Sequence, residues 1–280
     1  MRLSDKWLDY KIIDAGNKEK LEVWNGIVLR RPDPQAMWDV EETDIWKKVD
    51  GFYHRSKKIP EEWTVNYHGL TLKVSPTSFK HTGIFPEQAA NWDFMMEKIQ
   101  KANRPIKVLN LFAYTGAATM ACSLAGATEV VHVDAARGMV DWAKENMKLS
   151  HLEDHKIRFI VDDCLKFVLR EKRRGNQYDA IIMDPPSFGR GPSGEVWKFE
   201  EKIMELIHAC MDVLSENPLF FQVNAYTTGI SETVLENVMK MSLLKKYPNG
   251  KIEADEIGLP VVHNNLILPC GIYARWESIE

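Results

Sequence analysis

From Pro105 onward, short apolar segments alternate with longer amphipathic segments, and this alternation constrains the fold more than any other feature of the chain. Strands separated by helices in this way form a parallel sheet with right-handed crossovers. The expected strands are 106–112, 129–133, 157–161, 178–183 and 219–223. The expected helices are 116–125, 136–149, 164–172, 200–214 and 231–244. Two apolar segments after the last helix, 251–257 and 265–276, predict antiparallel strands at the edge of the sheet.

The first part of the chain has a different pattern, with short apolar segments separated by turn residues. Asn25-Gly26 lies between two of these segments and is a strong hairpin signal. We expect a small β-rich domain over 1–75, a linker with a helix over 76–104 and an α/β domain over 105–280. The strands expected in the first domain are 10–14, 21–24, 27–30, 63–67 and 70–74. Its tryptophans could stack on bases, but packing in a core is their more frequent role; they are Trp7, Trp24, Trp38, Trp46 and Trp63.

Charge and cysteine content exclude several classes of protein. The 36 basic and 40 acidic residues among 280 give a formal charge of −4, which argues against a strongly basic nucleic-acid-binding protein but leaves room for a local basic patch. No apolar run approaches the roughly 18 residues that span a bilayer, and no signal peptide is evident, so we expect a cytoplasmic protein. The four cysteines form no CxxC pair, which argues against zinc and disulfides. We expect no metal and no membrane association, and the sequence leaves monomer and homodimer open.

Ligands of open α/β sheets bind at the carboxyl ends of the strands, so the residues that follow each expected strand are the candidates for a site. The segment 110–116 follows the first strand and contains one glycine, Gly116. A dinucleotide fingerprint would need two further glycines, where this chain has Phe112 and Tyr114. The loop therefore argues against NAD and FAD.

Carboxylates follow the second and third expected strands. Asp134 could accept hydrogen bonds from both hydroxyls of a ribose or cap the next helix, and its place after the glycine turn favours the ribose. Asp163 could accept a hydrogen bond from an adenine amino group or cap a helix, and spacing alone does not decide between the two.

The segment Asp184-Pro185-Pro186-Ser187-Phe188 follows the fourth expected strand and is the most specific motif of the chain. Each proline fixes φ and lacks an N–H, so the acceptors around it have fixed positions. Such acceptors can hold an exocyclic amino group, and a phenylalanine can stack on a flat base. The alternative is a rigid turn with a core phenylalanine, but the other polar residues at the same sheet edge favour a functional role.

These motifs, in this order, resemble the class I S-adenosylmethionine-dependent methyltransferases. The segment 79–88 also resembles one that precedes the catalytic domain in bacterial ribosomal-RNA large-subunit methyltransferases, and 7–38 is similar to relatives of that subgroup. The resemblance covers nearly the whole chain. It implies a Rossmann-like α/β fold with a mostly parallel sheet, preceded by a small β-rich domain. It also implies S-adenosyl-L-methionine as cofactor and RNA, in particular ribosomal RNA, as substrate.

The resemblance assigns roles to individual residues. The loop that would surround the methionine part of the cofactor consists of Asn110, Phe112, Ala113, Tyr114, Thr115 and Gly116. The residues that would close over the cofactor from the side are Lys80, Thr82, Phe85 and Gln88. Asp134 with Ala135 would bind the ribose and Asp163 the adenine, while Asp184 and Pro185 would border the methyl-transfer site. Asn110 stands where an acid is usual in this class, and its amide can still hold the cofactor's amino group.

A second departure concerns the acceptor atom. Relatives that methylate carbon 5 of cytosine carry a cysteine nucleophile after the fifth strand, where this chain has no cysteine between 222 and 229. Methylation of a nitrogen is more compatible, because its lone pair attacks the methyl group directly and positioning supplies most of the catalysis. Asp184 and Asn224 would orient the acceptor, and Phe188 or Tyr226 would stack on it.

The leading hypothesis is therefore a methyltransferase that acts on a nitrogen of an RNA base. One alternative keeps the cofactor but has a small molecule or a protein as substrate. Another is a non-catalytic RNA-binding assembly module, against which the intact segment 184–188 argues. The segment 189–194 is expected to be a mobile active-site loop whose far side is anchored by Trp197. A basic cluster at 172–174 could contact phosphate, but a solvated helix end favoured by the helix dipole explains it better.

Overall fold

The computed structural model describes residues 1–52, 59–77 and 79–279. Contacts divide the chain into two compact units, one of residues 1–91 with 257–270 and one of 92–256 with 271–280. The late segment belongs to the first unit because Ile257 pairs with Arg2 and Val261 pairs with Ile12. These boundaries differ from the domain limits expected at 75 and 104, which remain a prediction.

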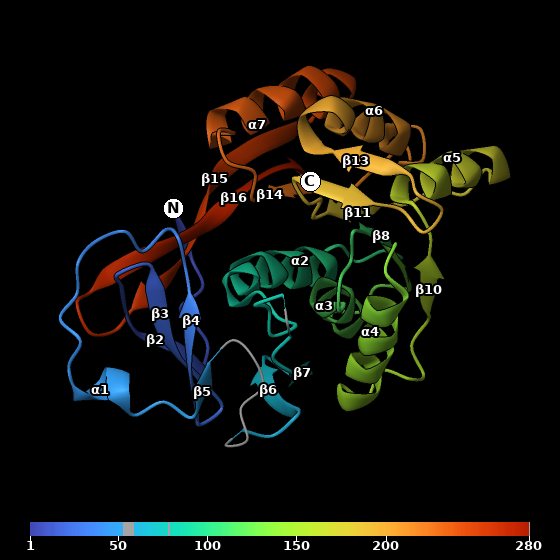
Figure 1. Ribbon diagram of the computed structural model, residues 1–280. Coiled ribbons are helices and arrows are strands. Elements are labelled where there is room, and N and C mark those ends of the chain that lie inside the picture. The colour runs from blue at the N-terminus through green and yellow to red at the C-terminus, as the bar shows by residue number, and fades with distance from the viewer. Residues whose placement is uncertain (53–58, 78, 280) are drawn as a thin grey trace. The chain divides into compact units, whose positions relative to one another are not determined.

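The second unit contains the predicted parallel sheet. Five parallel strands lie in the order β10-β9-β8-β11-β14, and antiparallel β16 follows β14 (Figure 1). Their bounds are β8 Lys107–Leu111, β9 Glu129–Asp134, β10 Ile157–Val161, β11 Ala180–Met183, β14 Phe220–Ala225 and β16 Leu266–Ser278. β15, Gly250–Val261, is the neighbour of β16, and both units contain part of each of these two strands. The mostly parallel α/β architecture and its antiparallel edge are thus confirmed.

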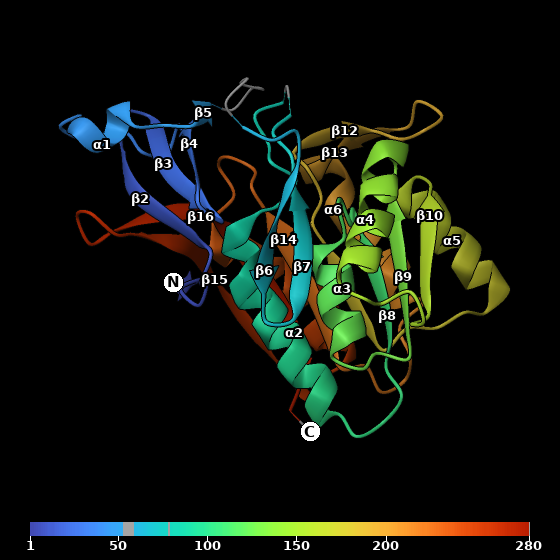
Figure 2. The same cartoon turned by 90° about the horizontal axis from the view of Figure 1, so that it is seen from below.

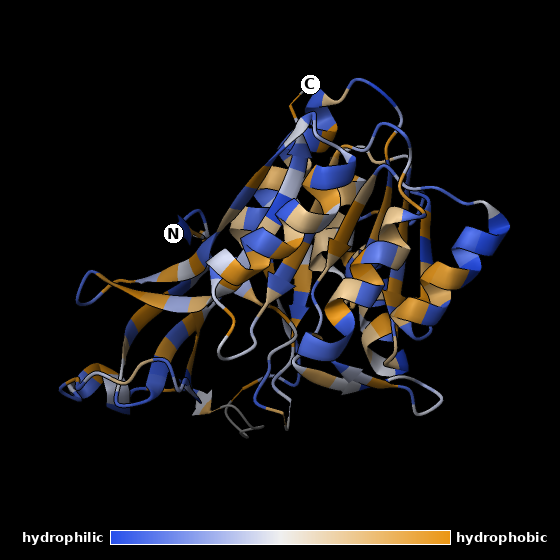
Figure 3. Cartoon of the chain, turned by 90° about the horizontal axis from the view of Figure 1, so that it is seen from above, coloured by the Kyte–Doolittle hydropathy of each residue, from blue (hydrophilic) through white to orange (hydrophobic). Residues whose placement is uncertain are grey.

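Helices cover both faces of this sheet (Figure 2). One face packs against α5, α6 and α7 in a single apolar cluster, and the other packs against α2 and α3, with α4 beside α3. Their bounds are α2 Ala89–Lys101, α3 Ala117–Leu124, α4 Arg137–Leu149, α5 Cys164–Arg174, α6 Phe199–Met211 and α7 Glu232–Met239. In Figure 3 the strands are largely hydrophobic, whereas the helices mix hydrophobic and hydrophilic residues as amphipathic helices do.

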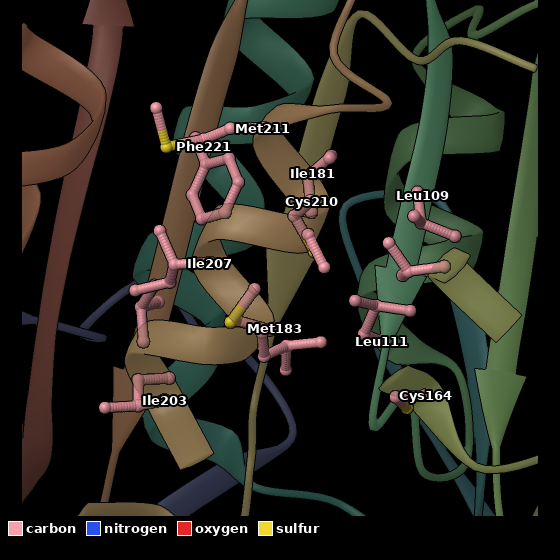
Figure 4. Close-up of a cluster of buried hydrophobic side chains, with 14 of the residues drawn as sticks. Leu109, Leu111, Cys164, Ile181, Met183, Ile203, Ile207, Cys210, Met211 and Phe221 are labelled. Carbon is pink, nitrogen blue, oxygen red and sulfur yellow. The ribbon is translucent and has the colours of Figure 1, made fainter. Parts of the chain in front are cut away.

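We call the sheet face under α5, α6 and α7 the apolar face. Its side chains include Leu109, Val131, Ile181 and Phe221, all fully buried. Figure 4 shows how side chains from β8, β11 and β14 meet those of α5 and α6 there. The opposite face, which carries Val108, Val130, Ala180 and Phe220, we call the mixed face because polar residues follow these in the same strands.

Several local predictions are refined. The helix expected within 76–104 is preceded by a 3-10 turn, η1 Pro86–Gln88, and α7 continues into a π-helical turn, η2 Lys240–Leu244. The expected loop over 189–194 is only partly correct, because Phe188–Arg190 (β12) pairs with Val196–Lys198 (β13) as a hairpin. The basic cluster lies in the exposed last turn of α5, where Lys172 bonds to Asp212 at 2.9 Å, as expected for a solvated helix end.

The first unit is the predicted β-rich part. Its described strands before η1 are β1 Arg2–Leu3, β2 Tyr10–Gly16, β3 Glu19–Trp24, β4 Ile27–Pro32, β5 Gly51–Phe52, β6 Trp63–Tyr67 and β7 Leu70–Val74, and the short helix α1, Asp44–Lys47, lies between β4 and β5. β2, β3 and β4 form an antiparallel meander, and β6 and β7 form a separate hairpin. Asn25 and Gly26 connect β3 to β4 with φ values of 47° and 85°, as a tight primed hairpin turn requires.

The tryptophans of the first unit are packing residues. Trp24 and Trp46 are 0% and 2% exposed, and their indole N–H groups donate to the carboxylates of Glu22 and Asp14. Glu22 is fully buried; burial alone would raise the pKa of its carboxyl, but the charge and hydrogen bonds of Arg31 lower it to about 2. The indole N–H groups of Trp7, Trp38 and Trp63 donate to backbone carbonyls. Core packing therefore explains these residues better than base stacking.

In the described parts of the chain, no helix combines the length and apolar character needed to cross a membrane. The same residues contain no cluster of three or more His, Cys, Asp or Glu side chains that could hold a metal ion. The four cysteines are free; Cys122, Cys164 and Cys210 are buried and Cys270 is half-buried.

Candidate active site

The loop from β8 to α3 has an unusual backbone. Phe112, Tyr114 and Gly116 have φ values of 53°, 54° and 85°, in the left-handed region that residues with a side chain rarely adopt. Hydrogen bonds hold this shape, since the N–H of Ala113 donates to the carbonyl of Val133 at 3.0 Å. Backbone strain of this kind is concentrated at functional sites, and here it occurs at the carboxyl end of the sheet.

Gly116 is required by its surroundings as well as by its φ. A Cβ at this position would lie 3.0 Å from the Cβ of Ala143 and 3.2 Å from Cε1 of His132. The glycine therefore lets the start of α3 approach both β9 and α4. Thr115 is buried beside it, and its carbonyl accepts a hydrogen bond from Nδ2 of Asn146 at 2.9 Å.

Asp134 is the last residue of β9, and its side chain holds the loop between β8 and α3 in place through hydrogen bonds. Its Oδ2 accepts the N–H of Tyr114 at 2.9 Å and its Oδ1 accepts the N–H of Ala136 at 2.9 Å. Burial raises the pKa of the Asp134 carboxyl, while these two hydrogen bonds act to lower it. Each carboxylate oxygen has a further lone pair, so Asp134 can still accept from a ligand. Ala136, not Asp134, is the N-cap residue of α4, and Ala135 lies half-buried between them.

Asp163 is the N-cap of α5. Its side chain accepts the N–H of Lys166 at 3.0 Å, which is the capping alternative that the sequence left open. The neighbouring Asp162 bonds to Arg170 at 2.7 Å. Capping alone accounts for the carboxylate at position 163, so its contact with adenine remains a prediction.

The segment after β11 is firmly anchored. The indole N–H of Trp197 donates to the carbonyl of Pro186 at 2.7 Å, and the N–H of Phe199 donates to the carbonyl of Ser187 at 3.0 Å. Trp197 is therefore the anchor that the sequence predicted. The alternative of a core phenylalanine is wrong, since the side chain of Phe188 is 54% exposed.

Asp184 and Asn224 lie side by side, at the carboxyl ends of the neighbouring strands β11 and β14. Met183 pairs with Val223 in the parallel ladder between β11 and β14, so the two polar residues are the next in register. Asn224 is 3% exposed, and its Oδ1 accepts a hydrogen bond from Nε2 of Gln222 at 2.9 Å. Pro185 is buried beside this pair.

Two further contacts shape this end of the sheet. The hydroxyls of Ser187 and Thr227 are 2.9 Å apart and join the segment after β11 to the one after β14. The side chain of Tyr226 is 38% exposed. A Cβ at position 271 would lie 2.9 Å from the ring of Tyr226, so the ring can occupy this position only because residue 271 is glycine. Phe188 and Tyr226 are thus both exposed aromatic residues at strand ends.

The sequence did not predict a buried polar network behind the loop. Nδ2 of Asn110 donates to Oγ1 of Thr119 at 3.0 Å, and Oγ1 lies 2.8 Å from Nδ1 of His132. Burial lowers the pKa of His132 to about 3, so its ring is neutral at neutral pH. The signal in the sequence is a single histidine between Val131 and Val133, in a strand whose other interior residues are all valine.

Four predicted cofactor residues belong to the first unit. Gln88 is buried and its Oε1 accepts a hydrogen bond from Nδ2 of Asn91 at 2.9 Å; Thr82 is also buried. Lys80 has a φ of 67°, and its carbonyl accepts a hydrogen bond from Arg31 at 2.9 Å. Phe85 precedes η1 and contacts the ring of His81. Closure of these residues over a cofactor remains a prediction.

The second unit thus gathers hydrogen-bond acceptors and exposed aromatic rings at the carboxyl end of its sheet. Cys164 lies next to this edge, but its sulfur accepts the N–H of Phe112 at 3.4 Å and burial raises the pKa of its thiol well above the usual range. A thiol in that state is a packing group and not a nucleophile.

Comparison with known proteins agrees with this geometry. A family model described as S-adenosylmethionine-dependent methyltransferase matches residues 52–208. The crystal structure of a SAM-dependent methyltransferase from Agrobacterium tumefaciens is 34% identical, with a TM-score of 0.93 over 98% of this chain and 92% of that one.

Two curated relatives have more specific names. Ribosomal RNA large subunit methyltransferase K/L of Colwellia psychrerythraea is 33% identical over 62% of this chain, which spans 23% of that relative's length. Ribosomal RNA large subunit methyltransferase K of Neisseria meningitidis is 23% identical over 85% of this chain and 73% of its own length. Because the family model covers more than half of the chain, the protein belongs to the S-adenosylmethionine-dependent methyltransferase family.

Proposed function

We propose that this protein transfers a methyl group from S-adenosyl-L-methionine to a nitrogen of a base in ribosomal RNA. The observation that carries the proposal is the register of β11 and β14, which makes Asp184 and Asn224 neighbours. The exposed ring of Phe188 follows Asp184 by four residues in the same segment. A carboxylate, an amide and an aromatic face are the groups that hold a base removed from its stack.

The loop and acceptors of the second unit fit the cofactor. In this proposal the 110–116 loop binds its methionine part, with Asn110 at the amino group, and Asp134 with Ala135 binds the ribose. Asp134 retains acceptor lone pairs beyond its two backbone hydrogen bonds. Asp163 borders the adenine. The resemblance to the family assigns four more residues to the cofactor; these are Lys80, Thr82, Phe85 and Gln88.

The cofactor supplies an electrophilic methyl group on a sulfonium sulfur. Asp184 and the carbonyl of Pro185 orient the acceptor nitrogen, and where that nitrogen carries a hydrogen, Asp184 accepts it as a hydrogen bond. Asn224 binds a second atom of the base, and Phe188 stacks on its ring. Positioning of this kind accounts for most of the catalysis in a direct displacement. No cysteine is required, and Cys164 is buried on the apolar face.

The names of the Colwellia and Neisseria relatives support ribosomal RNA as the substrate. An enzyme with that substrate would act in the cytoplasm. The formal charge of −4 favours a second candidate, a small-molecule or protein substrate with the same cofactor, because RNA-binding surfaces are usually basic.

The test uses S-adenosylmethionine with a radiolabelled methyl group. The protein is incubated with ribosomal RNA, ribosomal subunits, total protein and small metabolites from cells that lack it. We expect label in RNA, removed by ribonuclease, and nucleoside analysis then identifies the base. Label confined to protein or metabolites would support the second candidate, and no label despite cofactor binding would support a non-catalytic assembly module.

A further inference from the structure

Three buried side chains form a hydrogen-bonded series behind the loop that follows β8. Asn110 of β8, Thr119 of α3 and His132 of β9 are 2%, 0% and 0% exposed. Nδ2 of Asn110 donates to Oγ1 of Thr119 at 3.0 Å, and the same oxygen lies 2.8 Å from Nδ1 of His132. The series links three different elements directly under the strained backbone of the loop.

The direction of each hydrogen bond follows from the number of protons available. Oγ1 of Thr119 has one proton, and because it accepts from Asn110 that proton points to Nδ1 of His132. Nδ1 is then the acceptor, and the proton of the neutral ring resides on Nε2. Nε2 is buried, and a hydrogen bond from the ring to the backbone of Tyr114 acts to raise the pKa of His132, as expected for a proton on Nε2.

This direction decides which end of the Asn110 amide a ligand meets. The nitrogen is committed to Thr119, so the oxygen is the end that remains to accept. An ammonium group has only donors, so an amide oxygen attracts it and an amide nitrogen does not. A neutral, buried histidine keeps the series in this direction because it cannot donate from Nδ1 while its proton is on Nε2.

We propose that Thr119 and His132 are positioning residues that hold the Asn110 amide with its oxygen toward the ammonium group of the cofactor. The inference rests on the proposed function only for the identity of the ligand. It also explains why an asparagine is suitable where an acid is usual: a carboxylate has no N–H to give to Thr119, and the series would have to reverse.

The hydrogen-bond direction is measured by ¹⁵N nuclear magnetic resonance of histidine-labelled protein, without any cofactor. We expect His132 to be protonated on Nε2 in the wild type. In Asn110→Asp the hydroxyl of Thr119 must donate to the new carboxylate, so we expect the proton of His132 to move to Nδ1. His155, whose Nδ1 is 2.9 Å from the hydroxyl of Ser123, is the internal reference. A wild-type His132 protonated on Nδ1 would overturn the proposal.

The effect on the ligand is measured by calorimetry with S-adenosylhomocysteine and with its analogue lacking the amino group. Thr119→Val, which keeps the side-chain shape, should weaken binding of S-adenosylhomocysteine about three- to tenfold, the range expected for one hydrogen bond. It should leave binding of the deaminated analogue unchanged. His132→Leu should resemble Thr119→Val, and His132→Asn should restore part of the affinity because its amide oxygen can accept from Thr119.

Ser123→Ala is the matched control, since it also removes a buried hydroxyl bonded to a histidine from α3. We expect Ser123→Ala to change neither the affinity for S-adenosylhomocysteine nor the affinity for its deaminated analogue. Equal losses for both ligands in Thr119→Val, or equal losses in Thr119→Val and Ser123→Ala, would show a merely structural role and overturn the proposal. If no variant or wild type binds S-adenosylhomocysteine, the proposed function fails, while the resonance experiment still tests the hydrogen-bond direction.

Discussion

The two faces of the sheet in the second unit are built by the same strands but differ in chemistry. In β14, Phe221 and Val223 lie on the apolar face, whereas Gln222 and Asn224 lie on the mixed face. In β9, Val131 and Val133 lie on the apolar face and His132 on the other. The apolar face carries a charged group, Glu129 with Lys107 and Arg158, at the amino ends of its strands and is apolar from there to their carboxyl ends. The mixed face is the reverse, apolar at the amino ends of its strands and polar at their carboxyl ends.

The difference shows where the fold tolerates unfavourable burial. Oε1 of Gln222 is buried without a hydrogen-bond partner in the described structure, at a cost of about 1–3 kcal/mol. His132 is buried in its neutral form, and burial lowers its pKa to about 3. The strand residues that we identified on the apolar face, Leu109, Val131, Ile181 and Phe221 among them, are hydrocarbon or aromatic side chains without such polar atoms. Both faces bury apolar clusters, and the polar residues of the mixed face lie at the carboxyl end of the sheet, where the proposed ligands bind.

The largest expected effect is on catalysis. Asp184→Ala should lower methyl transfer about a thousandfold or more, because loss of an orienting charged group at the reacting atom costs about 10²–10⁴ in rate. Binding of S-adenosylhomocysteine should remain within about threefold of wild type by calorimetry. Asp212→Ala, which removes an exposed carboxylate bonded to Lys172, is the control. Retained activity in Asp184→Ala would remove this residue from the site.

The next effect separates the faces by stability. Phe221→Ala, on the apolar face, should lower the free energy of unfolding by about 3–5 kcal/mol. Gln222→Leu combined with Asn224→Leu should change it by about 1 kcal/mol or less, because both partners of one hydrogen bond and an unpaired oxygen are replaced together. The double variant should nevertheless lose methyl transfer. Denaturant titration gives the stabilities, and a loss like that of Phe221→Ala would contradict the comparison.

The third expected effect depends on pH and grows as the pH falls. The pKa of His132 is about 3 when folded and near 6.5 when unfolded, so the unfolded chain binds the additional proton between these values. The contribution of His132 is therefore full above pH 6.5 and is lost as the pH falls toward 3, by up to about 1.4 kcal/mol per pH unit. The difference in unfolding free energy between wild type and His132→Asn should shrink over that window. Val131→Ala, on the apolar face, should show a difference that does not vary with pH.

The smallest effect concerns Cys164 on the apolar face. Cys164→Ala removes a buried sulfur and the acceptor for the N–H of Phe112, so we expect a loss of about 1 kcal/mol in stability. Methyl transfer should remain within about threefold of wild type. Complete loss of transfer in a folded variant would instead indicate a covalent thiol mechanism and contradict methylation at a nitrogen.

Much of the fold was predictable because periodicity is local. The strands of the second unit and the meander of the first appear where the apolar segments were, with shifts of one or two residues at most ends. The loop over 189–194 was less predictable, because glycine and proline suggested irregular backbone but Phe188 and Val196 sit in a short hairpin. The unit boundary was also less predictable, because it depends on Val261 pairing with Ile12 across most of the chain.

The candidate site divides in the same way. Motif order placed Asp134 and Asp184 at one sheet edge, because carboxyl ends of parallel strands share an edge. Spacing left the cap of α5 by Asp163 open, although the N–H that its side chain accepts belongs to Lys166, only three residues away. It also could not tell that Phe188 is exposed, because exposure depends on packing in the folded chain. The spacing of residues also could not identify Thr119 as the hydrogen-bond partner of His132.

By itself the sequence determined the alternation of strands and helices, the sheet edge that carries the polar motifs and the resemblance to methyltransferases, because these reside in local patterns and their order. Only the tertiary structure decided which face each polar side chain occupies and which donor meets which acceptor. Asn110, Thr119 and His132 show why: they are 9 and 13 residues apart in sequence, yet one threonine hydroxyl joins all three. Hydrogen-bond direction depends on such encounters, and no spacing along the chain encodes them.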